Sequence, residues 1–321
     1  KGAAATAIKV SGKVIDPSKV TKGDVIGAVD PSTGAETGAQ VIRQVYPRLG
    51  IVPGLILAPG WSQIPEVGLA LAAKAAKING VYSAMALLDL DTAKAKKYTD
   101  TKSVKEESGY TSPFCYPLWP CDRVGEYILA KSAVAGAMIQ YMASDNEDVP
   151  NQSPSNHLLG VGGQCLTDGT EVYLDQDQAN TVNGYGVTTA INQNGYRLWG
   201  NYTGAYPASS DAKDIWFAVR RMFSWQGNNF IQTYFDEVDD PMNNVLVQSV
   251  VDSENIRCSA YAPKYWVGAS IEYKSDDNPK TAILAGTMKF RQHIAPYTPA
   301  QEIVDIIDYD TDTLAAAVGG N

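Results

Sequence analysis

Apolar positions follow two different periods in the first half of the chain. Short apolar runs that suit strands occur at Gly54–Ala58, at Val81–Leu90 and within Tyr110–Trp119. Apolar residues with helical spacing occur at Pro65–Asn79 and Gly125–Ala143. Because strands that alternate with helices form parallel sheets, this half predicts an α/β domain with a mostly parallel sheet.

A strand–turn–strand pattern closes that half. The β-branched apolar run Val187–Ile191 is followed by the polar turn Asn192–Gly195 and then by the aromatic strand Tyr196–Trp199. Asn194-Gly195 is a hairpin dipeptide, because both residues tolerate a positive φ. The pattern therefore predicts an antiparallel hairpin.

The second half groups its helices and strands separately. Helical patterns at Asp214–Trp225 and Met242–Ala260 precede strand patterns at Tyr265–Tyr273 and Thr287–Ile294, which indicates an α+β domain. Smaller features are a strand at Ala5–Ile15, an N-cap at Ser62, an exposed helix at Thr92–Tyr98 and a helix start at Pro241.

The C-terminal stretch has no sequence neighbour with which to form a hairpin. After Pro296 and Pro299, residues Gln301–Asp310 read as a strand on a proline-stiffened linker. Such a strand either folds back as an edge strand of its own sheet or adds to the sheet of a neighbouring subunit. The pattern alone leaves both alternatives open.

Composition narrows the classes of function. The chain has 321 residues, of which 45% are hydrophobic and 19% charged, as in a folded protein with a sizeable core. Its net charge of −9 argues against binding to a nucleic-acid backbone. No apolar run is long enough to cross a bilayer, so we expect no membrane insertion. The chain begins at Lys1, in mid-pattern, and we expect residues to precede it.

Motifs for chemistry are incomplete. Cys115, Cys121, Cys165 and Cys258 lack zinc spacing, so we expect reduced, partly buried thiols. Gly60-Trp61-Ser62 resembles a nucleophile elbow, but Ile64 stands where glycine is needed. Asp308–Asp312 begins like a calcium loop, but Thr313 replaces its glycine. The sequence therefore predicts no catalytic residue, cofactor or metal site.

Two alternatives to a structural protein remain open at this point. An α/β hydrolase would place its site at the carboxyl ends of the strands Gly54–Ala58 and Val81–Leu90, with Ser62 and Asp89 as candidates. A monomeric binding module is the other alternative.

Several segments, in order along the chain, resemble the sheath proteins of contractile tails in P2-like phages, R-type bacteriocins and related particles. They include Gly54-Leu55-Ile56-Leu57-Ala58-Pro59-Gly60, Asn79-Gly80-Val81-Tyr82-Ser83-Ala84 and, most sharply, Trp199-Gly200-Asn201. Tyr202 stands where family members often have arginine, which leaves that arginine's role open. The similarity covers roughly residues 37–310.

The resemblance implies a structural function without an enzymatic activity. Sheath subunits stack as hexameric rings around a tail tube, and a baseplate signal triggers a contraction that drives the tube through the host envelope. The implied partners are other copies of the chain, the tube protein, the baseplate and the tail terminator. The implied location is the virion, with assembly in the host cytoplasm.

The resemblance also assigns parts of this chain. It implies a partial β-rich outer subdomain at residues 1–45 without the family's N-terminal arm, a sheath α/β domain at 46–204, and a C-terminal domain at 205–321 whose arm spans about 296–321. It implies that the strand exchanged between subunits contains Ile303, Val304, Asp305, Ile306, Ile307 and Tyr309. A terminal helix facing the tube would present Thr311, Thr313 and Leu314.

Overall fold

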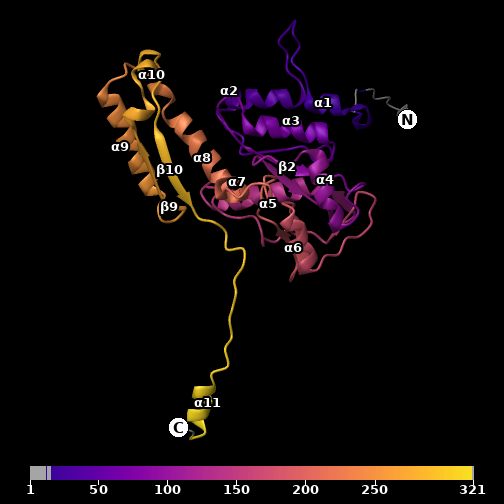
Figure 1. The fold of residues 1–321 in the computed structure, drawn as a ribbon. Coiled ribbons are helices and arrows are strands. Elements are labelled where there is room, and N and C mark those ends of the chain that lie inside the picture. The colour runs from indigo at the N-terminus through magenta and orange to yellow at the C-terminus, as the bar shows by residue number, and fades with distance from the viewer. Residues whose placement is uncertain (1–11, 13–15, 320–321) are drawn as a thin grey trace, which may run out of the picture.

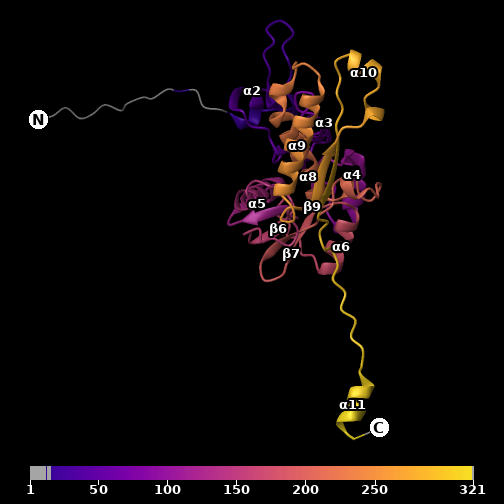
Figure 2. The same cartoon turned by 90° about the vertical axis from the view of Figure 1, so that its left-hand side faces the viewer.

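The computed structural model describes residue 12 and residues 16–319. Figure 1 shows an α/β body, a C-terminal lobe beside it and a long terminal extension, and the extension stands apart in Figure 2 as well. The strand expected at Ala5–Ile15 lies outside the described residues except for Gly12. Within the part that is described, no helix combines the length and apolar character needed to span a membrane.

The body is built on a parallel sheet of β1 (Leu55–Leu57), β2 (Met85–Asp89) and β3 (Cys115–Leu118), in that order. A bridge between Leu118 and Thr188 continues the parallel pairing beyond β3. The parallel sheet predicted from the alternating pattern is thus confirmed, with β1 at one edge.

Helices cover the two faces of this sheet. Ala86 and Leu88 of β2 pack in one apolar cluster with Val67 and Leu71 of α3 (Pro65–Ala76). Their neighbours Met85 and Leu87 pack in another cluster, with Ala135 and Ile139 of α5 (Lys131–Asp145). Since side chains alternate along a strand, β2 can be buried on both faces, as its apolar sequence requires.

Smaller elements complete the body. They are α1 (Lys22–Ile26), α2 (Val45–Leu49), α4 (Thr101–Ser108), β4 (Cys121–Val124), β5 (Tyr127–Leu129), β6 (Gly163–Cys165), α6 (Gln176–Gly184), β7 (Thr189–Asn192) and β8 (Tyr196–Trp199), with 3₁₀ turns at Pro17–Lys19, Gly38–Gln44 and Tyr98–Asp100. Antiparallel pairing of β7 with β8 across Asn194 and Gly195, both with positive φ, confirms the predicted hairpin.

The C-terminal lobe consists of two long helices against a two-stranded antiparallel sheet. Its elements are α7 (Ala212–Ile215), α8 (Phe217–Thr233), α9 (Asn244–Ala260), β9 (Trp266–Glu272), α10 (Lys280–Leu284) and β10 (Arg291–Pro296), with 3₁₀ turns at Phe235–Glu237 and Ser275–Asp277. Met222 of α8, Cys258 of α9 and Trp266 of β9 form its buried core.

Several local predictions were wrong. The long helix begins only at Lys131, because Tyr127–Leu129 pairs with β4 as a strand. Residues Thr92–Tyr98 form turns, and the helix lies at Thr101–Ser108. Asn243, not Pro241, precedes α9 and caps it. The last strand begins at Arg291, not at Thr287, because Asn278 bonds the backbone of Lys289 and holds it in a loop.

Candidate subunit interface

The terminal extension is the most exposed part of the described chain. From Gln301 the backbone runs extended and without a strand partner to α11 (Thr311–Ala317), away from the body in both views (Figures 1 and 2). The side chains of Ile303, Ile306 and Ile307 are 90%, 79% and 86% exposed. Val304, Asp305 and Tyr309 are exposed as well. So much exposed apolar surface on one segment is typical of an interaction site.

The extension starts from a sheet whose outer edges are open. β9 and β10 pair only with each other in the described sheet, and the chain leaves directly from β10. α9 packs on β9, and α8 contacts β10. Each strand therefore presents a row of backbone donors and acceptors to which a further strand could add.

Two hydrogen bonds hold the linker between this sheet and the extension. The Tyr297 hydroxyl donates to the carbonyl oxygen of Pro263 at 2.8 Å. The Tyr202 hydroxyl donates to Oε1 of Gln301 at 2.5 Å. The Tyr202 ring stacks on Tyr206 at a centroid distance of 3.8 Å and on Trp216 at 4.7 Å. The extension thus leaves the body at a defined point, beside the hairpin motif.

The terminal helix forms where it was expected. Asp310 caps α11 by accepting hydrogen bonds from the Thr313 hydroxyl at 2.5 Å and from the Thr313 backbone nitrogen at 2.9 Å, and these two bonds lower the pKa of its carboxyl. Thr311, Thr313 and Leu314 are exposed, Leu314 by 50%. α11 buries no residue against the rest of the described chain.

The residues of the Trp199-Gly200-Asn201 motif have structural roles. Gly200 has a φ of 146°, and a Cβ there would lie 2.6 Å from Oγ1 of Thr188. Its carbonyl oxygen accepts a hydrogen bond from the buried Tyr116 hydroxyl at 2.7 Å. Only glycine fits this close approach of hairpin and sheet. The motif thus joins the hairpin to the parallel sheet.

The residues suggested for a hydrolase do meet, but in the core. The Ser62 hydroxyl donates to Oδ2 of Asp89 at 2.9 Å, and the backbone nitrogen of Ser132 donates to Oδ1 of Asp89 at 2.8 Å. Ser62 is fully buried, and it does not cap α3 as predicted, because Ile64 is the residue before the helix and no side chain caps it. Burial raises the pKa of Asp89. This network joins β2 to α5 and leaves the Ser62 hydroxyl out of reach of a substrate.

Other polar residues also have structural roles. Lys131 and Asp122 form a fully buried ion pair that sequence reasoning missed, because Lys131 gave no local signal. All four cysteines are buried, and burial raises the pKa of Cys115 to about 11 and that of Cys121 to about 12. His293 pairs with Glu272, and burial lowers the pKa of His157. Across the described ranges, no group of three potential ligands could hold a metal.

Comparison with known proteins gives one consistent result. The chain is 25% identical over 328 residues to the tail sheath protein of Burkholderia phage BcepMu, covering 99% of this chain and 68% of that protein. It is 23% identical to the tail sheath protein of Escherichia phage P2, covering 88% of this chain and 69% of the relative. A putative prophage major tail sheath protein of Pseudomonas aeruginosa UCBPP-PA14 is 32% identical, over 62% of this chain and 48% of that protein. No protein-family model matches.

Solved structures share the fold. The sheath of an extracellular contractile injection system (PVC) in the contracted state matches with a TM-score of 0.67 and 17% identity, covering 86% of this chain and 76% of that one. The contracted helical sheath of the anti-feeding prophage matches with a TM-score of 0.65 and 17% identity, covering 88% and 76%. Fold and sequence agree: this chain is similar in sequence to tail sheath proteins of phages and shares its fold with the sheaths of contractile particles.

Proposed function

We propose that this chain is a structural subunit that polymerises as stacked hexameric rings around a tail tube and contracts to drive the tube through a host envelope. Its exposed extension supports this proposal most directly. Ile303–Tyr309 is extended, exposes several apolar side chains and lacks a strand partner in the described chain, so it suits donation to a neighbour's sheet. The hydrolase alternative has no support, because the similar proteins are sheath proteins.

The same proposal assigns a role to each part of the chain. Residues 1–45 would be part of an outer subdomain, 46–204 the sheath α/β domain and 205–321 the C-terminal domain. The linker from about 296 would bend during contraction while the donated strand stays paired, because backbone hydrogen bonds survive rigid-body rotation of the domains. Thr311, Thr313 and Leu314 of α11 would face the tube.

The partners follow from assembly. One similar structure is a baseplate of the anti-feeding prophage, which supports association of this chain with a baseplate as well as with its own copies. The tube protein and a tail terminator would complete the particle. The subunit would be made in the host cytoplasm and would end up in the virion, where its many weak links add up over each ring.

Substitutions that remove backbone donors from the arm test the proposal. In the full-length protein, Val304→Pro with Ile306→Pro deletes two backbone N–H groups, whereas Val304→Ala with Ile306→Ala keeps both. We expect the proline pair to abolish striated tubes in negative-stain electron microscopy, as deletion of Gln301–Asn321 should. The alanine pair should still form tubes at higher concentration. Unchanged assembly of the deletion variant would contradict the proposal.

A further inference from the structure

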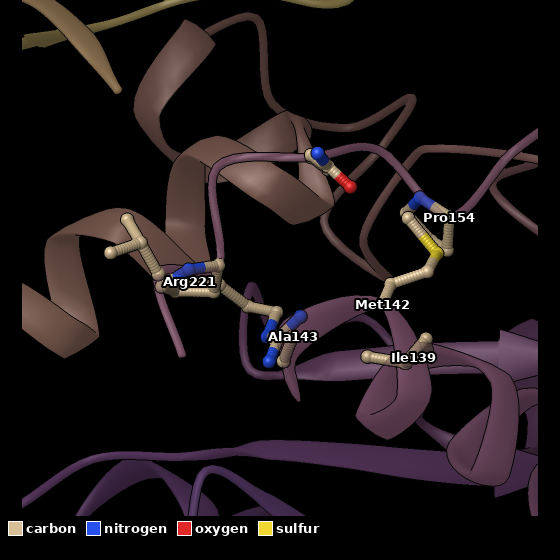
Figure 3. Close-up of a pocket in the computed structure, with 8 residues that line it drawn as sticks. Ile139, Met142, Ala143, Pro154 and Arg221 are labelled. Carbon is tan, nitrogen blue, oxygen red and sulfur yellow. The ribbon is translucent and has the colours of Figure 1, made fainter. Parts of the chain in front are cut away.

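A groove of about 780 Å³ lies outside the surfaces discussed so far. Its walls are the loop Gly50–Gly54, β1, α5 and α8. β1 pairs only with β2 in the described sheet, so its other edge is open. A smaller cavity adjoins the groove and shares Ala143, Pro150 and Arg221 with it (Figure 3). The groove is too large for one small ion and has room for a short peptide segment.

Arg221 is the basic residue among those that line this groove, whose rim also carries the exposed carboxylate of Asp148. It is half-buried on α8, and its guanidinium carbon lies 5.6 Å from the centroid of the Phe217 ring. Among the described residues, no carboxylate forms an ion pair with it and no acceptor takes a hydrogen bond from it. Its neighbour Arg220, in contrast, bonds Asp214 at 3.1 Å.

The charge on Arg221 persists at neutral pH. Loss of hydration lowers its pKa, but only to about 10. A half-buried cation that forms no ion pair costs free energy, and a carboxylate bound to its guanidinium would recover that cost. Arginine suits this task, because its planar fork can bind both oxygens of a carboxylate.

A second, independent feature points to a ligand. Ser224 lies three residues further along α8, on the same face as Arg221, and also lines the groove. It is 6% exposed, and its hydroxyl oxygen has no hydrogen-bond partner among the residues described. The Asn229 and Gln232 side chains line the same wall. A carboxylate bound by Arg221 would give the Ser224 hydroxyl an acceptor.

We propose that this groove binds a carboxylate side chain carried by a second copy of this chain, held by Arg221 and Ser224. The inference rests on the proposed function, in which identical subunits pack against one another. Charge favours this occupant, because the chain has 35 acidic and 26 basic residues. Leu55, Leu57 and Trp225 give the groove apolar walls as well.

One segment of the chain carries both the carboxylates and the exposed apolar side chains that such a groove would bind. Phe235–Asp240 carries Asp236, Glu237, Asp239 and Asp240, none of which forms an ion pair within the described ranges, and its Phe235 and Val238 are 65% and 63% exposed. It follows α8, whose last residue lies about 18 Å along the axis from Arg221. The segment of the same subunit therefore begins near the Gln232 end of the groove, far from Arg221, and we assign the contact with Arg221 to the segment of a neighbour.

Photo-crosslinking in the assembled sheath tests the contact. The full-length protein would carry p-benzoylphenylalanine at Gln232, with Gly227, an exposed position of α8 that does not line the groove, as the control. Mixing ¹⁵N-labelled and unlabelled subunits separates links between copies from links within one. We expect a link between copies to a peptide containing Asp236–Asp240. Links within one copy only, or to peptides without acidic residues, would overturn the proposal.

A substitution separates this contact from folding and from sheath formation itself. Arg221→Gln should raise the critical concentration for polymerisation about tenfold, the equivalent of one charge-assisted hydrogen bond. The melting temperature of its monomer should be unchanged or higher, because an unpaired half-buried charge is removed; Arg221→Lys should be intermediate. Wild-type tubes together with an unchanged critical concentration in Arg221→Gln would overturn this inference alone. Absence of wild-type tubes would instead contradict the proposed function.

Discussion

Lys105 is a buried cation that forms no ion pair with a carboxylate in the described part of the chain. It is 3% exposed, and its ammonium group donates hydrogen bonds to the carbonyl oxygens of Tyr185, at 2.9 Å, and Tyr206. These bonds tie α4 to the segments on either side of the β7–β8 hairpin. Burial lowers the pKa of Lys105 to about 8, from 10.5 for an exposed lysine. Folding therefore makes this residue easier to deprotonate.

The low pKa of Lys105 predicts a pH dependence of stability. Between pH 8 and 10.5 the unfolded chain holds this proton more firmly than the folded chain does, so the contribution of Lys105 to the free energy of unfolding rises with pH. The rise is at most about 3 kcal/mol, at about 1.4 kcal/mol for each tenfold change in proton affinity. Lys105→Met should remove it in urea unfolding measured across this window.

The exposed Lys102, on the same helix, provides the control. Lys102→Met should leave the pH profile of the wild type unchanged. Comparing variants is necessary because buried thiols such as Cys115, whose pKa is raised to about 11, act in the opposite direction in the same window. Parallel profiles for the wild type and Lys105→Met would contradict the assignment.

At the scale of elements, Tyr202 is one of the two tyrosines whose hydroxyls hold the base of the arm. Tyr202→Phe removes the hydroxyl that bonds Gln301 but keeps the ring that stacks on Tyr206 and Trp216. We expect a loss of stability of about 1 kcal/mol, typical of one hydrogen bond. Amide hydrogen exchange should become faster around Gln301 and stay the same in β9 and β10. Tyr173→Phe, which removes a hydrogen bond between the exposed Tyr173 and Glu171, is the matched control and should leave exchange at Gln301 unchanged.

The elements differ in how far local sequence determines them. β1, β2, the β7–β8 hairpin and α11 were predictable, because apolar runs, Asn194-Gly195 and the cap Asp310 act locally. Tyr127–Leu129 also fits a helix when read alone. It becomes a strand because Gly125, with a φ of 60°, turns the chain and β4 supplies a partner. Long-range pairing overrides a local pattern there.

Local sequence also determined only part of the candidate interaction sites. The exposed arm was visible in the sequence, because it follows two prolines and has no neighbouring strand with which to pair. Ser62 was predicted to cap a helix, because it stands just before the helical pattern. Its actual hydrogen-bond partner, Asp89, lies 27 residues away and cannot be seen in the local sequence. Arg221 and Ser224 carry no local signal at all. Only the three-dimensional structure, in which α5, α8 and the Gly50–Gly54 loop surround one groove, shows that these two side chains lack partners.

For the whole molecule, net charge opposes the assembly that we propose for the arm. The chain carries −9 at neutral pH, so identical copies repel one another at long range. The proposed strand exchange relies on backbone hydrogen bonds and apolar side chains, which salt screens little. Assembly thus combines a repulsion that depends on salt with an attraction that largely does not.

This balance predicts how polymerisation responds to salt. Raising NaCl from 0.01 to 0.1 M shortens the screening length from about 30 to about 10 Å, so repulsion between neighbouring subunits should weaken. The critical concentration of the full-length protein, measured by sedimentation of tubes, should therefore fall over this range. It should fall less in a variant with Asp305→Asn, Asp308→Asn and Asp312→Asn, because three negative charges are gone from the arm. A critical concentration that rises with salt would show instead that attraction between opposite charges, as proposed for Arg221, outweighs the net repulsion.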